Sequence, residues 1–162
     1  MAEFIVRTAE ETRELGRKLA TVLAAGDLLV LTGGLGAGKT TFTQGLGAGL
    51  NVAGQIASPT FVIARTHEPQ GPGPGLVHVD AYRLESLDEV DALDLDTSLE
   101  DAITVVEWGE GMVEQLSQDR LDIEITRPRG AERDLADDTR VITITPRGAR
   151  WDALRWDGFP TQ

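Results

Sequence analysis

The chain of 162 residues has no cysteine, only two histidines, and no long hydrophobic run. Without cysteine there can be no disulfide, no thiolate zinc site and no cysteine nucleophile. The histidines, His67 and His78, are too few for a histidine-rich metal cluster. The longest apolar stretch near a candidate span, Leu28 to Leu31, is far shorter than the ~20 residues of a membrane helix. The acidic start also lacks the apolar segment of a secretory signal, so we expect a cytoplasmic protein without a membrane partner.

Positive charge is scarce as well. The chain has 15 lysines and arginines against 27 aspartates and glutamates, which gives a net charge of -12. Proteins that bind nucleic acids need basic side chains to displace the counterions of the phosphates. We therefore expect no direct binding of DNA, and any role in a nucleic-acid pathway should depend on a protein partner.

The apolar pattern predicts one α/β domain over residues 1–162. Thr8 to Glu11 fits a capping box, which predicts a helix over about residues 9–25. The apolar run at 28–32 is typical of a strand covered on both faces. The other predicted elements are a helix over about 40–50 and strands at 61–64, 76–80, 103–107, 121–126 and 141–145. The last two strands alternate polar and apolar residues, as half-exposed antiparallel strands do.

The motif with the clearest chemistry is GGLGAGKTT at residues 33–41, between an apolar strand and a helix. Its Gly33-x-x-x-x-Gly38-Lys39-Thr40 pattern matches the Walker A phosphate loop. Glycines allow several backbone N–H groups to converge on phosphate oxygens, and the following helix directs its positive end there. Lys39 is expected to reach the β- and γ-phosphates, and the Thr40 hydroxyl to complete the coordination of magnesium.

Two further strands end in an acid, as LVHVD does at Asp80 and ITVVE does at Glu107. The carboxyl ends of parallel strands line the ligand crevice of an α/β sheet, and phosphoryl transfer needs acids there to hold magnesium. The sequence therefore predicts that these acids meet the phosphate loop.

The nucleotide class follows in part by exclusion. The Asn-Lys-x-Asp motif of GTPases cannot occur, because the only other lysine is Lys18. A small-molecule kinase stays open, since Arg127, Arg129 and Arg133 could belong to a lid that closes over the phosphates. The polar, glycine- and proline-containing composition of this stretch favours an exposed hairpin loop.

Four segments in order resemble the TsaE (YjeE) family of bacterial P-loop ATPases. They are LTGGLGAGKTTFTQGL, SPTFVI, HVDAYRL and VVEWGE. The resemblance covers about residues 8–127, and the C-terminal strands and tail, 128–162, carry no motif of the family. It implies a three-layer P-loop NTPase-like fold, with a mostly parallel central sheet, helices on both faces and antiparallel C-terminal strands.

The resemblance also implies a function. Family members bind ATP or ADP with Mg²⁺ and are the ATPase of tRNA threonylcarbamoyladenosine biosynthesis, weakly active alone. Their partners, TsaB and TsaD, transfer the threonylcarbamoyl group to an adenosine next to the anticodon. Contact with tRNA only through these partners agrees with the acidic charge of the chain.

The site residues implied by the resemblance fall into three groups. Lys39, Asp80 and Thr60 are expected to be catalytic, with Asp80 orienting the attacking water and Thr60 acting as a switch near the γ-phosphate. Thr40, Glu107 and Asp80 are expected to hold the metal. The phosphates are expected to lie against Leu35, Gly36, Ala37, Gly38, Lys39, Thr40 and Thr41. No motif indicates the adenine contacts, which we assign to the segments near Thr8 and Arg127.

One residue departs from the family pattern: Gly34 stands where members often have aspartate. Hydrolysis should be slower if that aspartate assists water or magnesium, whereas phosphate binding should not change. This keeps a non-catalytic, nucleotide-sensing subunit open beside the ATPase and the small-molecule kinase. In the tail, Trp151 and Trp156 are expected to pack or to form a docking surface.

Overall fold

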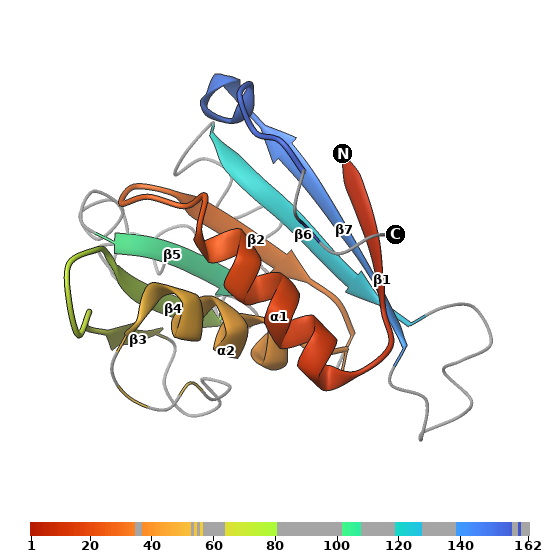
Figure 1. Cartoon of the computed structure of the whole chain (residues 1–162), viewed down its shortest axis with the longest axis horizontal. Coiled ribbons are helices and arrows are strands. Elements are labelled where there is room, and N and C mark those ends of the chain that lie inside the picture. Colours follow the sequence, from red (N-terminus) through yellow and green to blue (C-terminus); the bar gives the residue numbers. More distant parts are fainter. Residues whose placement is uncertain are drawn as a thin grey trace.

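A computed structural model shows a mixed sheet crossed by two α-helices in the part of the chain that it describes (Figure 1). The described residues are 1–34, 37–52, 54, 56, 64–80, 102–107, 119–127, 139–156 and 159, with Ala64 and Asp80 described by their backbone alone. The strands are β1 Ala2–Val6, β2 Leu28–Thr32, β3 Ala64–His67, β4 Gly75–Asp80, β5 Ala102–Glu107, β6 Arg120–Thr126 and β7 Arg140–Arg147. Their spatial order is β1-β7-β6-β2-β5-β4-β3.

The centre of the sheet is parallel. Strand β2 pairs in parallel with β5 on one side and with β6 on the other, and β5 pairs in parallel with β4. Leu28, Leu29, Val30 and Leu31 are all buried. This confirms the strand predicted from the apolar run and its cover on both faces, because successive side chains point to opposite faces.

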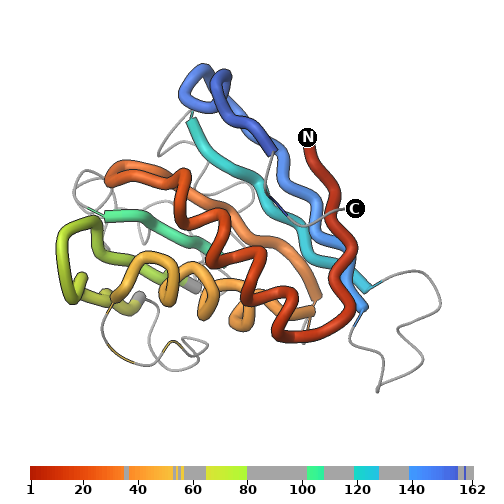
Figure 2. The backbone as a smooth tube through the Cα atoms, in the orientation of Figure 1, coloured from red at the N-terminus to blue at the C-terminus, as the bar shows by residue number. Residues whose placement is uncertain are grey.

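The edges of the sheet are antiparallel, where β3 pairs with β4 and β7 pairs with both β6 and β1. The sequence did not indicate β1, although its residues alternate between buried and exposed positions. Phe4 of β1 lies opposite Ile142 of β7, so the first and last strands of the chain are neighbours (Figure 2). Such a long-range pairing leaves only a weak local signal in a strand of five residues.

Two strand predictions need correction. The strand expected at 61–64 runs from Ala64 to His67, and residues 61–63 lie outside the described residues. Strand β6 was expected to be antiparallel, yet it is antiparallel only to β7 and parallel to β2. Polar and apolar residues alternate along β6 because only one face of the strand is buried. Such one-sided burial also occurs in a strand with a parallel neighbour, so the alternation does not show strand direction.

Helix α1, Ala9–Ala20, begins as predicted, because Thr8 and Glu11 form a complete capping box. It ends earlier than the predicted residue 25. After Ala20 the backbone closes tighter turns, in which the N–H of Leu23 donates to the carbonyl of Ala20. Leu23 packs against the core from this turn, which explains why the apolar spacing read as helix.

Helix α2, Lys39–Leu50, agrees with its prediction and lies beside α1 on one face of the sheet (Figure 1). Leu19 of α1 and Phe42 of α2 join Leu29, Leu31 and other residues of this face in one core cluster. The two helices approach closely at glycines, where a side chain on Gly16 or Gly45 would overlap the backbone of the other helix. A helical layer on the opposite face stays a prediction.

The tail packs onto the N-terminal strand, as the sequence suggested for its tryptophans. Trp151 is buried in the core cluster. Trp156 lies edge-on to Phe4, with 5.7 Å between the ring centroids. Neither of the helices in the described residues is long and apolar enough to cross a membrane.

Candidate functional site

The N-terminus of α2 is open, in contrast to that of α1. Gly38 is its N-cap, with φ of 113° and no side-chain hydrogen bond, and the first turn contains no acid. The first N–H groups of a helix have no acceptor within the helix and carry the positive end of its dipole. At α1 the Thr8 hydroxyl accepts from the N–H of Glu11, the Glu11 carboxylate accepts from that of Thr8, and Glu10 adds a second acid to the first turn. At α2 no side-chain cap and no acid compete for an anion at this end, which is what the Walker A pattern predicts.

Lys39 is folded back onto the loop that precedes it. Its Nζ lies 2.8 Å from the carbonyl oxygen of Gly33 and 3.0 Å from that of Gly34. The side chain is 8% exposed. The structure thus holds the only lysine of the loop at the start of α2, bonded to the loop itself.

Two glycines of the loop have opposite surroundings. A Cβ on Gly33 would lie 2.5 Å from the carbonyl oxygen of Ile125, at the end of β6. Gly34, in contrast, has nothing within 4 Å of its Cβ position and is exposed. The loop therefore needs glycine at 33 to pass β6 closely, whereas position 34 has room for the aspartate of the family pattern.

The strand ends bring the predicted acids to this loop. Asp80 and Glu107 are register partners in β4 and β5, and Glu107 is also level with Leu31 of β2. Because the loop begins two residues after Leu31, Glu107 ends its strand at the same edge of the sheet. The register thus places Glu107 and the backbone of Asp80 at the edge of the sheet where the loop begins, and their contact with the loop stays a prediction.

Glu107 is buried beside a histidine. It is 3% exposed, His78 is fully buried, and 3.5 Å separate Nε2 of His78 from Oε1 of Glu107. Within the described part of the chain, neither ring nitrogen of His78 nor Oε1 of Glu107 has a hydrogen-bond partner. A buried carboxylate oxygen without a partner is costly, and coordination of a cation is one way to satisfy it.

These donors fit a magnesium ion held together with a nucleotide. No group of three histidines or acids that could hold a metal occurs among the described residues. In nucleotide sites, magnesium is usually bound through one or two carboxylates, with phosphate oxygens and water completing its shell. Glu107 and the Thr40 hydroxyl, in the first turn of α2, suit that arrangement.

Comparison with known proteins gives the family. The family model "Threonylcarbamoyl adenosine biosynthesis protein TsaE" matches residues 6–135. The chain belongs to the TsaE family. It is 61% identical to the TsaE protein of Streptomyces coelicolor, over 86% of this chain and 93% of that protein. It is 41% identical to TsaE of Bacillus subtilis, over 90% of this chain and 85% of that protein.

A solved structure agrees with the TsaE assignment. The crystal structure of YdiB from Bacillus subtilis matches with a TM-score of 0.69 and 34% identity, over 93% of this chain and 88% of that one. The resemblance stated from the four sequence segments is thus confirmed, and so is a mixed α/β sheet of the TsaE type.

The other predicted site residues divide into placed and undescribed ones. Thr40 and Thr41 are half-buried in the first turn of α2, and Ala37 is buried in the loop. Leu35, Gly36, Thr60 and the side chain of Asp80 lie outside the described residues. Their roles stay predictions, and so does the lid suggested for Arg129 and Arg133.

Thr8 and Arg127, assigned to the adenine, lie at the same edge of the sheet as the loop. Arg127 directly follows β6, and Thr8 follows β1, whose direction is that of β6. The Thr8 hydroxyl already accepts from the N–H of Glu11 at 3.1 Å. Its hydrogen-bonding role in the described structure is therefore to cap α1, and contact with adenine stays a prediction for both residues.

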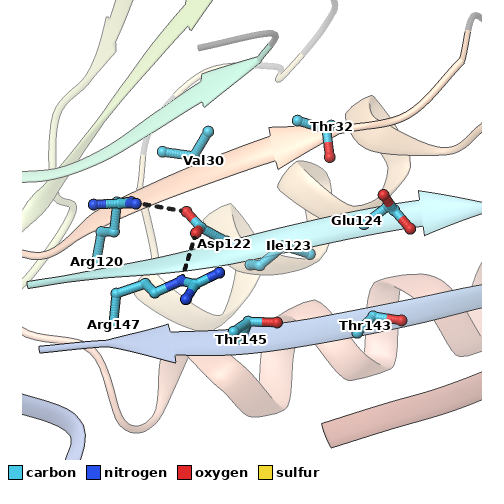
Figure 3. A pocket seen from close by; sticks show the side chains of 9 residues that line it. All are labelled: Val30, Thr32, Arg120, Asp122, Ile123, Glu124, Thr143, Thr145 and Arg147. Carbon is cyan, nitrogen blue, oxygen red and sulfur yellow. Dashed lines mark hydrogen bonds and ion pairs between the residues drawn. The ribbon is translucent and has the colours of Figure 1, made fainter. Parts of the chain in front are cut away.

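A hollow of about 360 Å³ lies on the sheet face opposite the two helices (Figure 3). Asp122 lies between two arginines, with Arg120 Nε at 3.0 Å and Arg147 Nε at 3.1 Å. Glu124 balances the second positive charge, so the charged side chains of the lining sum to zero. Such a lining offers little attraction to a polyphosphate.

One residue of the site was missed from the sequence. Arg140, at the start of β7, donates from Nε to the carbonyl oxygen of Ala37 in the loop, at 2.9 Å. A signal was present, because the alternation that buries Ile142 and Ile144 also places Arg140 on the buried face. An arginine at a core position needs a partner there.

Proposed function

We propose that this TsaE family member binds ATP or ADP with Mg²⁺ at residues 33–41 and hydrolyses ATP for the threonylcarbamoyl modification of tRNA adenosine. The observation that carries the proposal is the uncapped N-terminus of α2 with Lys39 held at its mouth. A helix start without a side-chain cap, a nearby lysine and a carboxylate at the end of a neighbouring strand is the arrangement that P-loop NTPases use for phosphates.

In this proposal each predicted residue has a chemical task. Lys39 leaves its two loop carbonyls and contacts the β- and γ-phosphates, while the backbone of 35–41 surrounds the phosphate oxygens. Thr40, Glu107 and Asp80 hold Mg²⁺, which when bound neutralises charge on the phosphates. Asp80 orients the attacking water, and Thr60 senses the γ-phosphate. These roles place the catalytic groups at the carboxyl edge of a three-layer P-loop fold, in agreement with the parallel strands β6, β2, β5 and β4.

The partners in this proposal are the TsaB and TsaD proteins. The net charge of -12 disfavours direct contact with tRNA, so the tRNA is held by the complex. The relatives carry tRNA threonylcarbamoyladenosine biosynthesis in their names, which supports the same pathway. We propose that the protein acts in the cytoplasm and has low ATPase activity until TsaB and TsaD are present.

The test is the steady-state rate of ATP hydrolysis, measured alone and with the cognate TsaB–TsaD pair. Lys39→Ala removes the lysine of the loop, and Lys18→Ala is the matched control, because Lys18 is the only other lysine and lies on α1. A rise on adding the partners that Lys39→Ala abolishes and Lys18→Ala retains supports the proposal. Turnover that depends on a metabolite and yields a phosphorylated product would instead identify a small-molecule kinase.

A second candidate rests on Gly34, which stands where the family pattern often has aspartate. If that carboxylate is needed for hydrolysis, the chain is a nucleotide-sensing subunit whose ATP- and ADP-bound forms dock differently. Tight ATP binding with negligible turnover in the presence of both partners would identify this function.

A further inference from the structure

Arg140 is a buried arginine at the beginning of β7. It is 8% exposed and shares its face of the strand with Ile142 and Ile144, which belong to the core. Arginine is almost never buried at such a position unless its guanidinium group is paired. The contacts of this group therefore explain why the residue is there.

The guanidinium group of Arg140 binds backbone carbonyls on two segments. Nε donates to the oxygen of Ala37 at 2.9 Å, and Nη1 donates to the oxygen of Thr139 at 2.9 Å. Ala37 lies in the phosphate loop, 103 positions away along the chain. This bond thus ties the loop to the C-terminal part of the sheet, outside residues 6–135 that match the TsaE family model.

The carbonyls of the described loop residues are all occupied. Lys39 Nζ binds those of Gly33 and Gly34, the N–H of Ala37 also donates to Gly34, and the Gly38 carbonyl accepts from the helix. When Lys39 turns to a phosphate, it gives up its two bonds to the loop. The bond from Arg140 to Ala37 does not have to break, because Arg140 donates from a separate strand.

We propose that Arg140 is a positioning residue for the polyphosphate of a nucleoside di- or triphosphate. It holds the Ala37 carbonyl toward β7, so that this oxygen does not turn to the anion and the loop N–H groups stay available. Its charge is permanent and adds positive potential beside the loop. The inference rests on nucleotide binding at residues 33–41, as proposed above.

The first test is ADP affinity by titration calorimetry. Arg140→Met keeps most of the side-chain volume and removes both donors, which should weaken ADP binding about tenfold. Arg147→Met is the matched control, because Arg147 lies on the same strand, is 55% exposed and pairs with Asp122. It removes the same charge without touching the loop and should leave the affinity unchanged.

The second test separates positioning from a general role in folding. Hydrogen exchange of the nucleotide-free Arg140→Met protein should be faster in peptides that contain Ala37 to Thr40, while peptides from β2 and β5 keep their protection. If Arg140 only stabilises the fold, Arg140→Met should exchange faster throughout the sheet. That result would overturn the inference. If Arg140→Met does not fold, Arg140→Lys keeps the charge but lacks the Nε–H donor, and the same comparison applies.

The outcomes distinguish this inference from the proposed function. Normal ADP affinity in Arg140→Met, with binding lost in Lys39→Ala, would overturn the role of Arg140 and leave the nucleotide site standing. Absence of ADP binding by the unmodified protein would overturn both. Weaker binding with exchange increased only in the loop supports the positioning role.

Discussion

His78 and Glu107 lie side by side in the interior, with Nε2 of His78 3.5 Å from Oε1 of Glu107 on the neighbouring strand. Both ring nitrogens and this carboxylate oxygen lack hydrogen-bond partners among the described residues. A purely structural core would not favour such a pair, because buried polar atoms without partners cost stability. The role proposed for Glu107 as a magnesium ligand would account for it, since the carboxylate would then gain a partner on binding.

We therefore expect Glu107→Gln to separate stability from activity. Removing the buried charge should raise the free energy of unfolding by about 1 kcal/mol in the absence of nucleotide. Partner-stimulated ATP hydrolysis should fall about 100-fold, because the metal loses one of its two carboxylate ligands. Denaturant unfolding and steady-state hydrolysis measure the two effects. Glu124→Gln, at an exposed position of β6, is the control and should change neither. A loss of stability in Glu107→Gln would mean that a charged His78–Glu107 pair is structural.

Gly33→Ala should weaken nucleotide binding. Its Cβ would lie 2.5 Å from the Ile125 carbonyl oxygen and 3.2 Å from the Ala37 side chain, so the loop must move away from β6. Overpacking of this kind costs roughly 1–3 kcal/mol, and we expect ADP affinity to fall about tenfold. Gly34→Ala is the matched control with free space around its Cβ. Equal affinities for the two variants would show that the contact with β6 does not shape the site.

Gly34→Asp should accelerate hydrolysis without changing ADP affinity. Position 34 is exposed and has room for a side chain, so the aspartate of the family pattern fits without distortion. We expect a rise of about tenfold in partner-stimulated turnover, below the ~100-fold of direct proton transfer, because the carboxylate would orient water or metal. Gly34→Asn tests whether the charge is needed. Unchanged turnover in Gly34→Asp would show that the absence of aspartate at position 34 does not limit hydrolysis.

Arg150→Met should destabilise the protein and leave the nucleotide site intact. Arg150 donates to both carboxylate oxygens of Asp27, at 3.2 and 3.1 Å, and Asp27 is 5% exposed. Because Arg150 is partly exposed, we expect a loss of about 1–2 kcal/mol in urea unfolding. ADP affinity should not change, since Asp27 precedes β2 and the loop follows its other end. Arg147→Met, which breaks a more exposed pair, should cost less than about 1 kcal/mol.

Much of the site was predictable because its parts are local in the sequence. The Walker A spacing, the cap at Thr8 and the acids at the ends of β4 and β5 each depend on a few consecutive residues. The apolar run of β2 likewise reflects burial on both faces, which any parallel central strand requires. The end of α1 was placed too late, because Val22 and Leu23 pack against the core from a turn rather than from a helix.

By itself the sequence determined that a loop with the Walker A pattern joins a buried strand to a helix, and that two further strands end in acids. Only the tertiary structure decided which distant segments meet. The register of β2, β4 and β5 places Glu107 beside Leu31 on one side and Asp80 on the other. The pairing of β7 with β6 brings Arg140 to Ala37. Local periodicity depends on neighbours in the chain. Register and strand order depend on burial of the whole core, so a short sequence pattern cannot predict them.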